Sequence, residues 1–245
     1  MNAYRAAKGV LRHILDTYVR RRCRLEFEAQ SFLRFNERPV EYAFLFRKLA
    51  ELYPLRVLDV GTGMTALPHL ISNCGPLVTA TDNVRDYWPE WTTNRHYHVL
   101  DDDITETRLK DRFDLVCCIS TLEHIKTPEA AVRNMFRLLN PGGSLILTFP
   151  YTEGRYVANV YDLPGSSYGR GLPYVAQSYS RRDLDRWLAE SDGEIVEQEL
   201  WRFWSGDFWT VGKQIIPPER ASADTLHQLT CVHLRRSAAH EDRTT

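Results

Sequence analysis

The stretch LRVLDVGTGMT, residues 55–65, decides the fold of this chain. Its first six residues form an apolar run of strand length, which predicts a strand buried on both faces. Gly61 and Gly63 follow at once, where glycines let the backbone turn sharply and let a ligand approach the main chain. A Gly-x-Gly pair alone is common, so its meaning depends on the rest of the chain.

Short apolar runs continue to alternate with helical segments along the chain. The predicted strands cover residues 55–60, 77–82, 96–100, 113–120, 144–150, 194–204 and 229–236. The predicted helices cover residues 40–52, 65–72, 129–139 and 180–191. Continuously apolar strands separated by helices indicate a parallel sheet covered on both faces. We therefore expect an α/β fold with a doubly wound, mostly parallel, seven-stranded sheet, whose ligand site lies at the carboxyl ends of the strands.

The charge is balanced overall but not along the chain. The 245 residues carry 31 basic and 32 acidic side chains, a net charge of -1, which argues against a protein-wide nucleic-acid surface. Residues 1–24 hold seven basic residues and one acidic residue, a net of +6, so the remainder carries -7. The basic residues are Arg5, Lys8, Arg12, Arg20, Arg21, Arg22 and Arg24.

The basic segment also has apolar residues at helical spacing, which predicts an amphipathic helix that bends or ends near Arg21 and Arg22. These apolar residues are Val10, Leu11, Ile14, Leu15, Tyr18 and Val19. One interpretation is a helix packed on the main domain with a solvated basic face. The other is peripheral contact of residues 1–24 with an anionic membrane or a phosphate-bearing substrate.

Three regions are expected from this pattern: an N-terminal helical extension over 1–39, a main domain over 40–236, and a flexible tail over 237–245. Within the main domain, residues 151–179 lose the alternation but are rich in tyrosine, and we interpret them as a lid over the acceptor. Five cysteines without CxxC spacing indicate reduced thiols and a cytoplasmic protein. No apolar run approaches the roughly 18 residues of a membrane span.

Polar residues follow the ends of four predicted strands. Asp59 and the glycine pair end the first strand, and Asp82 ends the second, where dinucleotide folds hold a ribose. The third strand is followed by Asp101-Asp102-Asp103-Ile104, and the fourth by Ser120-Thr121-Leu122-Glu123-His124-Ile125. A helix stop, Leu139-Asn140-Pro141-Gly142-Gly143, precedes the fifth strand.

With VLDVGTG, Asp82, LEHI and LNPGG together, residues 40–150 resemble the class I S-adenosylmethionine-dependent methyltransferases, of type 11/12-like sequence. The resemblance implies that S-adenosylmethionine is the cofactor and S-adenosylhomocysteine the product. It implies that Asp82 holds the ribose, that Asp103 accepts from the adenine amino group beside the Ile104 backbone, and that Ser120 lies near the sulfonium. Asp102 is the alternative adenine contact. The expected cofactor residues are Asp59, Gly61, Thr62, Gly63, Asp82, Asn83, Asp102, Asp103, Ile104 and Ser120.

Other interpretations of these residues stay open at this point. Asp59 and Asp82 also suit ordinary turns. Thr65 stands where the family often has a third glycine, which predicts a less open loop. The nicotinamide-dehydrogenase pattern requires a third glycine before the helix, and this interpretation does not explain the LNPGG stretch. His96 and His98 share one face of a predicted strand, but no third ligand accompanies them, so we expect no metal.

Methyl transfer to a hydroxyl needs a base that removes the proton. His124 is the candidate, since histidine titrates in the useful range, although a structural role suits it too. Glu123 is a weaker candidate or a partner of His124. Tyr151 directly follows the fifth strand and is expected to face the acceptor.

The acceptor itself is expected to lie under the tyrosine-rich segment. Tyrosines suit sugars or rings, and arginines suit a phosphate or carboxylate. The candidate acceptor-binding residues are Arg155, Tyr156, Tyr161, Arg170, Tyr174, Trp204 and Trp209. Core packing is the favoured interpretation of this aromatic cluster, with Trp204 and Trp209 expected to be more exposed than Trp201 and Phe203.

This segment, WSGDFWT (204–210) and the basic helix look similar to methyltransferases found with bacterial surface-polysaccharide and glycolipid synthesis. We expect O-methylation of a small molecule or glycan. Methylation of an amine or of nucleic acid is the alternative, as is a non-catalytic cofactor-binding subunit. The oligomeric state stays open, as does location in the cytoplasm or at the inner membrane surface.

Overall fold

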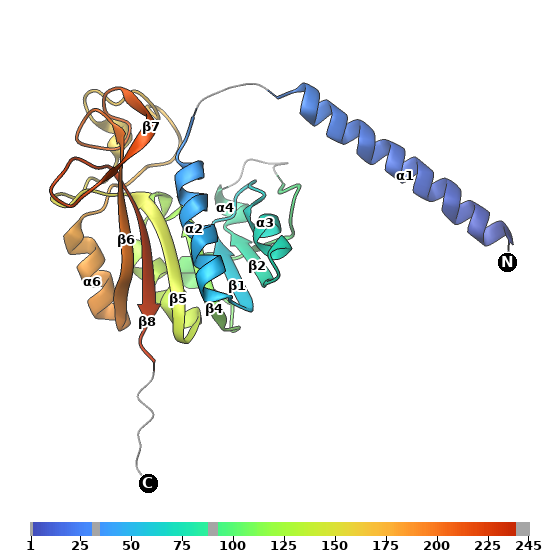
Figure 1. Ribbon diagram of the computed structural model, residues 1–245, viewed down its shortest axis with the longest axis horizontal. Helices are drawn as coiled ribbons and strands as arrows, with labels where there is room; N and C mark the ends of the chain where they lie inside the picture. The colour runs from blue at the N-terminus through green and yellow to red at the C-terminus, as the bar shows by residue number, and fades with distance from the viewer. Residues whose placement is uncertain (1, 31–34, 88–92, 239–245) are drawn as a thin grey trace, which may run out of the picture. The chain divides into compact units, whose positions relative to one another are not determined.

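The computed structural model describes residues 2–30, 35–87 and 93–238 (Figure 1). The chain divides into two compact units, Met1–Asn36 and Glu37–Thr245. Residues 239–245 of the expected tail lie outside the described residues. None of the described helices combines the length and the apolar character that crossing a membrane requires.

The second unit is built on one eight-stranded sheet in the order β3-β2-β1-β4-β5-β8-β6-β7 (Figure 1). The strands are β1 Arg56–Val60, β2 Leu77–Asp82, β3 Val99–Asp101, β4 Phe113–Ile119, β5 Leu139–Pro150, β6 Gly193–Trp204, β7 Gln214–Ala221 and β8 Leu229–Arg236. The first five strands are parallel to one another. β8 lies between β5 and β6 and pairs antiparallel with both, and β7 pairs antiparallel with β6. The doubly wound α/β fold is confirmed, with a mixed sheet.

The prediction of seven strands is wrong by one, because no strand was predicted over the residues of β7. β7 contains Pro217 and Pro218, which lack the N–H group that a sheet ladder needs. It lies at the edge of the sheet, where one side of the strand has no partner and a missing donor is tolerated. His96 and His98 precede the short strand β3 and do not share a strand face, contrary to expectation.

Helices cover both faces of the sheet, and the alternation of side chains along β4 shows the division. Leu115 and Cys117 pack with α2 and α3, whereas Val116 and Cys118 pack with α5 and α6. The helices of this unit are α2 Arg38–Leu52, α3 Leu67–Asn73, α4 Val84–Tyr87, α5 Pro128–Leu138 and α6 Arg181–Ser191, with single turns η1 Ile104–Glu106, η2 Leu122–His124 and η3 Val160–Asp162. A capping box of Ser180 and Asp183 starts α6, which confirms the start of the helix predicted over residues 180–191.

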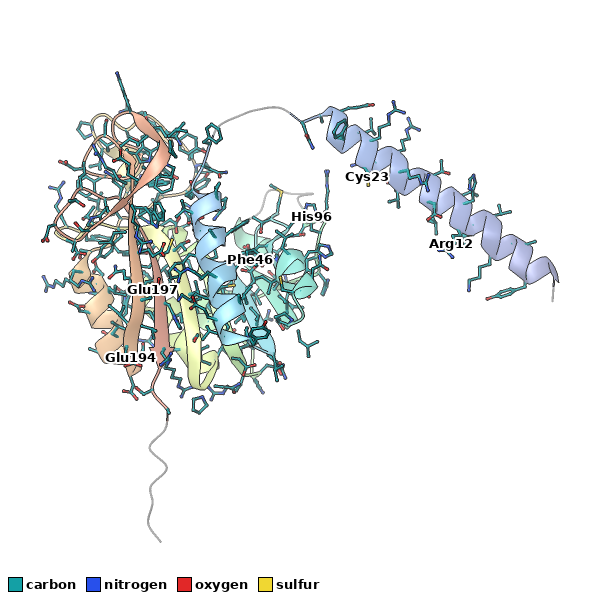
Figure 2. The ribbon with its side chains drawn as sticks, in the orientation of Figure 1. Arg12, Cys23, Phe46, His96, Glu194 and Glu197 are labelled. Carbon is teal, nitrogen blue, oxygen red and sulfur yellow. The ribbon has the colours of Figure 1, made fainter. Side chains whose placement is uncertain are left out.

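Ion pairs fasten α2 to strand β6. Arg47 contacts Glu197 at 2.7 Å and Glu199 at 2.6 Å, and Lys48 also pairs with Glu197. Hydrogen bonds from Arg47 lower the pKa of Glu197 to about 2. Figure 2 labels Glu197 on the sheet and Phe46 on α2. This network fixes α2, whose first turn reaches the carboxyl ends of the strands.

The first unit consists mainly of α1, Asn2–Glu28. The helix continues through Arg21 and Arg22, so the expected bend or end there is wrong. Straight-chain arginines are good helix formers, and the ion pair of Arg24 with Glu28 at 2.8 Å supports the last turns.

Candidate functional site

The sheet topology brings the predicted site residues to one edge. Strands β1, β2, β3 and β4 are parallel neighbours, so their carboxyl ends meet at the same edge. The chain reverses its direction of winding between β1 and β4, which is where open α/β sheets bind ligands. A pocket at this point lies between α2 and the loop after β1, and its lining residues are Arg38, Tyr42, Asp59, Gly61, Thr62, Thr65, Leu67 and Ile119.

The turn after β1 is held by hydrogen bonds within the protein. Gly61 N–H donates to the carbonyl of Thr81 at 2.9 Å, and Thr62 donates from its hydroxyl to the Asp59 carboxylate at 2.8 Å. Burial raises the pKa of Asp59 to about 6 despite that bond. Asp59 thus stabilises the turn through a buried hydrogen bond, and it also lines the pocket.

Gly61 is required by both conformation and space. Its φ is +74°, and a Cβ there would lie 2.1 Å from Cγ2 of Thr121. Gly63, at φ +57°, is open around the position of a Cβ. The backbone can therefore be approached closely at Gly63, as a cofactor site in this turn requires.

The loop after β1 is held by further hydrogen bonds that the sequence did not predict. Thr65, in place of a third glycine, donates its hydroxyl to the carbonyl of Thr62 at 2.8 Å. The Asn94 side-chain amide donates to the carbonyls of Gly63 and Thr65 at 2.8 and 2.9 Å. Asn94 lies 34 residues past the end of β1 in an irregular segment, so no sequence pattern pointed to it.

Asp82 ends β2 beside this loop. One of its carboxylate oxygens accepts from the N–H of Gly63 at 2.7 Å. A carboxylate held by the glycine loop at the end of the second strand has the position and chemistry to receive ribose hydroxyls. The Asp82 carboxylate lies beside the glycine loop, and the pocket itself offers the Arg38 guanidinium and apolar walls at Leu67 and Ile119. This combination fits a nucleoside that carries an amino-acid chain.

The carboxylates after β3 have different surroundings. Asp102 is buried and accepts from the Thr107 hydroxyl and from Arg108 N–H at 2.9 Å, so it holds the following loop. Asp103 is exposed, and the Asn83 amide is 3.4 Å from it. Asp103 also accepts from Thr105 N–H at 2.8 Å. These positions favour Asp103 over Asp102 as a contact for a ligand.

Ile104 and Ser120 occupy the remaining expected cofactor positions. The Ile104 side chain is buried in the core, and its carbonyl accepts from Asn134 at 2.9 Å. Ser120 follows β4 at φ +45°, and its N–H donates to the carbonyl of Thr148 at 3.1 Å. This strained backbone turns the chain away from β4 at the edge where the pocket lies.

Two charged residues of α2 belong to the site and were not predicted. Glu41 is fully buried and accepts from the hydroxyls of Ser120 and Thr148 at 2.5 and 2.7 Å. Arg38 donates to Glu41 at 2.9 Å and to the carbonyl of Ile119 at 3.4 Å. The sequence did contain a sign of Glu41's role: a charged residue falls on the same helix face as the apolar Phe44 and Leu45, and this face is buried.

His124 lies in η2, in contact with the 151–179 segment. Its Nδ1 is 2.6 Å from the carbonyl oxygen of Val175, and its ring meets Tyr174 edge-on at 4.9 Å. A carbonyl only accepts, so Nδ1 carries the hydrogen and Nε2 keeps its lone pair. Burial lowers the pKa of His124 below its ordinary value near 6.5.

Glu123 is buried, and its Oε1 lies 3.9 Å from Nε2 of His124. Burial, followed by the nearby charge of Glu41, raises the pKa of Glu123 to about 8. At neutral pH, Glu123 is therefore mostly protonated and His124 mostly neutral. Their contact is not an ion pair under those conditions.

Tyr151 does not face an acceptor as expected. It is fully buried, stacked on His227 at 5.8 Å, with the Arg181 guanidinium 5.9 Å from its ring centre. Because side chains alternate along a strand, Tyr151 shares the face of Phe149, which packs against α6. Tyr151 is a core residue in this structure.

The aromatic residues expected to bind the acceptor fall into two groups. Tyr161 and Trp204 are buried at 6% and 3% exposure, and Trp209 is partly buried against Trp204 and Phe203. Trp204 is therefore less exposed than Trp201, contrary to expectation, whereas core packing of this cluster is confirmed. Tyr161 also fills the space beside Gly169, where a Cβ would lie 2.1 Å from its ring.

The remaining members are accessible. Arg155, Tyr156 and Arg170 are exposed, and Tyr174 is partly exposed beside His124. Arg155 lies over the ring of Phe208, with its guanidinium carbon 4.7 Å from the ring centre. These four residues are the predicted acceptor contacts that a ligand could reach.

A family model described as "Methyltransferase domain" matches residues 27–198. A ubiquinone biosynthesis O-methyltransferase of Xanthomonas oryzae pv. oryzae is 30% identical over 181 residues, 68% of this chain and 74% of that protein. A protein with the same name from Coxiella burnetii is 28% identical over 167 residues, 63% of this chain and 69% of that protein.

Solved structures share the fold at lower identity. The 1,6-didemethyltoxoflavin-N1-methyltransferase of Burkholderia thailandensis, with bound S-adenosylhomocysteine, has a TM-score of 0.52 at 18% identity, over 96% of this chain and 90% of that one. The N-methyltransferase NodS of Bradyrhizobium japonicum, also with S-adenosylhomocysteine, has a TM-score of 0.50 at 17% identity, over 82% and 87%. With its glycine turn, its Asp82 carboxylate and the family match, this chain belongs to the methyltransferase-domain family and is an S-adenosylmethionine-dependent methyltransferase.

Proposed function

We propose that this enzyme methylates a hydroxyl oxygen of a small molecule or glycan, with His124 as the general base. The observation that carries the proposal is the pairing of His124 Nδ1 with the carbonyl of Val175 at 2.6 Å. It leaves Nε2 as the basic nitrogen, and the lowered pKa keeps the ring neutral at neutral pH. A neutral imidazole can take the hydroxyl proton as the oxygen attacks.

The cofactor supplies an activated methyl group, so the protein's task is placement and proton removal. Asp82 would hold the ribose hydroxyls, and Asp103 with Asn83 would contact the adenine. Arg38, at the other end of the pocket, would pair with the carboxylate of the methionine part. Glu41 fixes Arg38 and the turn at Ser120, so it would position both the cofactor and the strand end.

The acceptor would lie under the 151–179 segment, next to His124. Tyr174 and Val175 of this segment already contact the His124 ring, so an acceptor reaching that ring must pass them. Exposed Tyr156, Arg155 and Arg170 would supply a flat apolar contact and positive charge. The names of the relatives from Xanthomonas and Coxiella, both O-methyltransferases, also favour oxygen as the methylated atom.

An acceptor screen tests the choice of atom. The enzyme is incubated with S-adenosylmethionine labelled in its methyl group and with matched pairs of small phenols or sugars and their amino counterparts. We expect label on the hydroxyl compounds, and the carbon shift of the product methyl group distinguishes oxygen from nitrogen. Label found on nitrogen only would overturn the proposal in favour of N-methylation.

The pH dependence tests the base. We expect kcat/KM to rise with pH through a pKa below 6.5 and to be level at neutral pH, because only neutral His124 accepts a proton. The sign follows from burial, which disfavours the charged imidazolium and so extends the active form to lower pH. This rise of kcat/KM with pH, the acidic limb of the profile, should disappear in His124→Asn. A limb that persists in that variant would assign the titration to another group.

A further inference from the structure

Helix α1 carries an apolar face that is exposed along most of its length. The six apolar residues of the amphipathic pattern, including Leu11 and Ile14, are between 54% and 63% exposed. Exposed apolar side chains are common singly, but a continuous stripe of them marks a contact surface. Figure 2 labels Arg12 and Cys23 on this helix.

The basic side chains border this stripe. At about 100° per residue, Val10, Ile14, Tyr18 and Leu11 fall within one apolar arc. Leu15 and Val19 extend the arc, and Lys8 falls between them. Arg12 lies just beyond this border, Arg24 beyond the other border, and Arg20 on the opposite side of the helix. Arg21 and Arg22 fall on the arc itself, where their long side chains can extend their charges outward while the stems contact apolar surface. All of these side chains are exposed.

We propose that α1 lies on anionic lipid bilayers, with its apolar stripe in the boundary between headgroups and acyl chains and its arginines on the lipid phosphates. The charge disfavours a second copy of the helix as the occupant. Residues 1–24 carry a net charge of +6, so packing two copies of the helix together would bring like charges into contact. An anionic surface complements both the stripe and its basic borders.

The test is flotation of the full chain with vesicles of phosphatidylcholine, with or without phosphatidylglycerol. We expect binding to the phosphatidylglycerol vesicles that falls as salt rises, and little binding to phosphatidylcholine alone. The double variant Leu11→Glu/Ile14→Glu should lose at least about tenfold in the partition coefficient, because two apolar side chains no longer insert. Arg12→Gln/Arg20→Gln/Arg21→Gln should weaken binding selectively to the anionic vesicles.

Leu77→Glu is the matched control, since Leu77 is 73% exposed but lies in the other unit. It should bind vesicles as the unchanged chain does. Equal binding to both kinds of vesicle, or full binding by the Leu11→Glu/Ile14→Glu variant, would overturn the proposal. So would a dimer in sedimentation velocity that this double variant abolishes, because the stripe would then be an interface between copies. The readout needs no acceptor and is independent of the proposed O-methylation.

Discussion

Replacing His124 with alanine is expected to lower kcat at least about 10²-fold, with little change in cofactor affinity. The loss follows from removing Nε2, the nitrogen left basic by the bond from Nδ1 to Val175. Single-turnover rates with an acceptor from the screen, and calorimetry with S-adenosylhomocysteine, measure the two quantities separately. His69→Ala, an exposed histidine on α3, is the control and should leave both unchanged.

A second variant separates catalysis from support of the 151–179 segment. Alanine also leaves the carbonyl of Val175 without its donor, so the segment itself could shift. Asparagine keeps an N–H donor for that carbonyl but supplies no base. If His124 is the base, His124→Asn is as slow as His124→Ala. Turnover near that of the unchanged enzyme in His124→Asn would mean that the histidine only holds the segment.

Much of the cofactor region could be predicted because its determinants are local. A buried strand followed by Gly61 and Gly63 specifies the turn through backbone conformation alone, and the structure has positive φ at both. The carboxyl ends of parallel neighbours then bring Asp82 to this turn by topology. These inferences need only strand order and the alternation of strands with helices.

The choice among three consecutive acids could not be made in the same way. Asp102 points inward to Thr107 and Arg108, and Asp103 outward beside Asn83, because of the path the chain takes after β3. That path depends on packing of η1 against α5, a contact between distant segments. Sequence spacing alone leaves the register of such a turn uncertain by one residue.

Other differences between the predicted and the observed site arise because aromatic and charged side chains are buried by contacts between distant parts of the chain. Tyr151 was placed by its nearness to the strand end, whereas the alternation from Phe149 would have put it in the core. Trp204 is buried because it packs in the core cluster with Phe203 and Leu229, and the Trp209 ring meets it edge-on with 6.1 Å between ring centres. Arg38 and Glu41 were missed because the helix was treated as a cover for the sheet rather than as a wall of the pocket.

Replacing Asp82 with alanine is expected to weaken binding of S-adenosylhomocysteine by about 10²-fold or more. Hydrogen bonds to a charged group contribute about 1.5–3 kcal/mol each, and a carboxylate can accept from both ribose hydroxyls. Since about 1.4 kcal/mol corresponds to a tenfold change, two such bonds give this loss. Calorimetry with each variant measures the affinity.

Two further variants make the result specific to the ribose contact. Asp82→Asn keeps an oxygen that can accept from Gly63 N–H, now 2.7 Å from the carboxylate, but loses the charge. It should bind more tightly than Asp82→Ala and more weakly than the unchanged enzyme. Asp111→Ala removes an exposed carboxylate just before the amino end of β4, opposite the pocket, and should bind as the unchanged enzyme does. Unchanged affinity in a folded Asp82→Ala would show that the carboxylate only closes the glycine turn, and the ribose would then need another partner at this edge of the sheet.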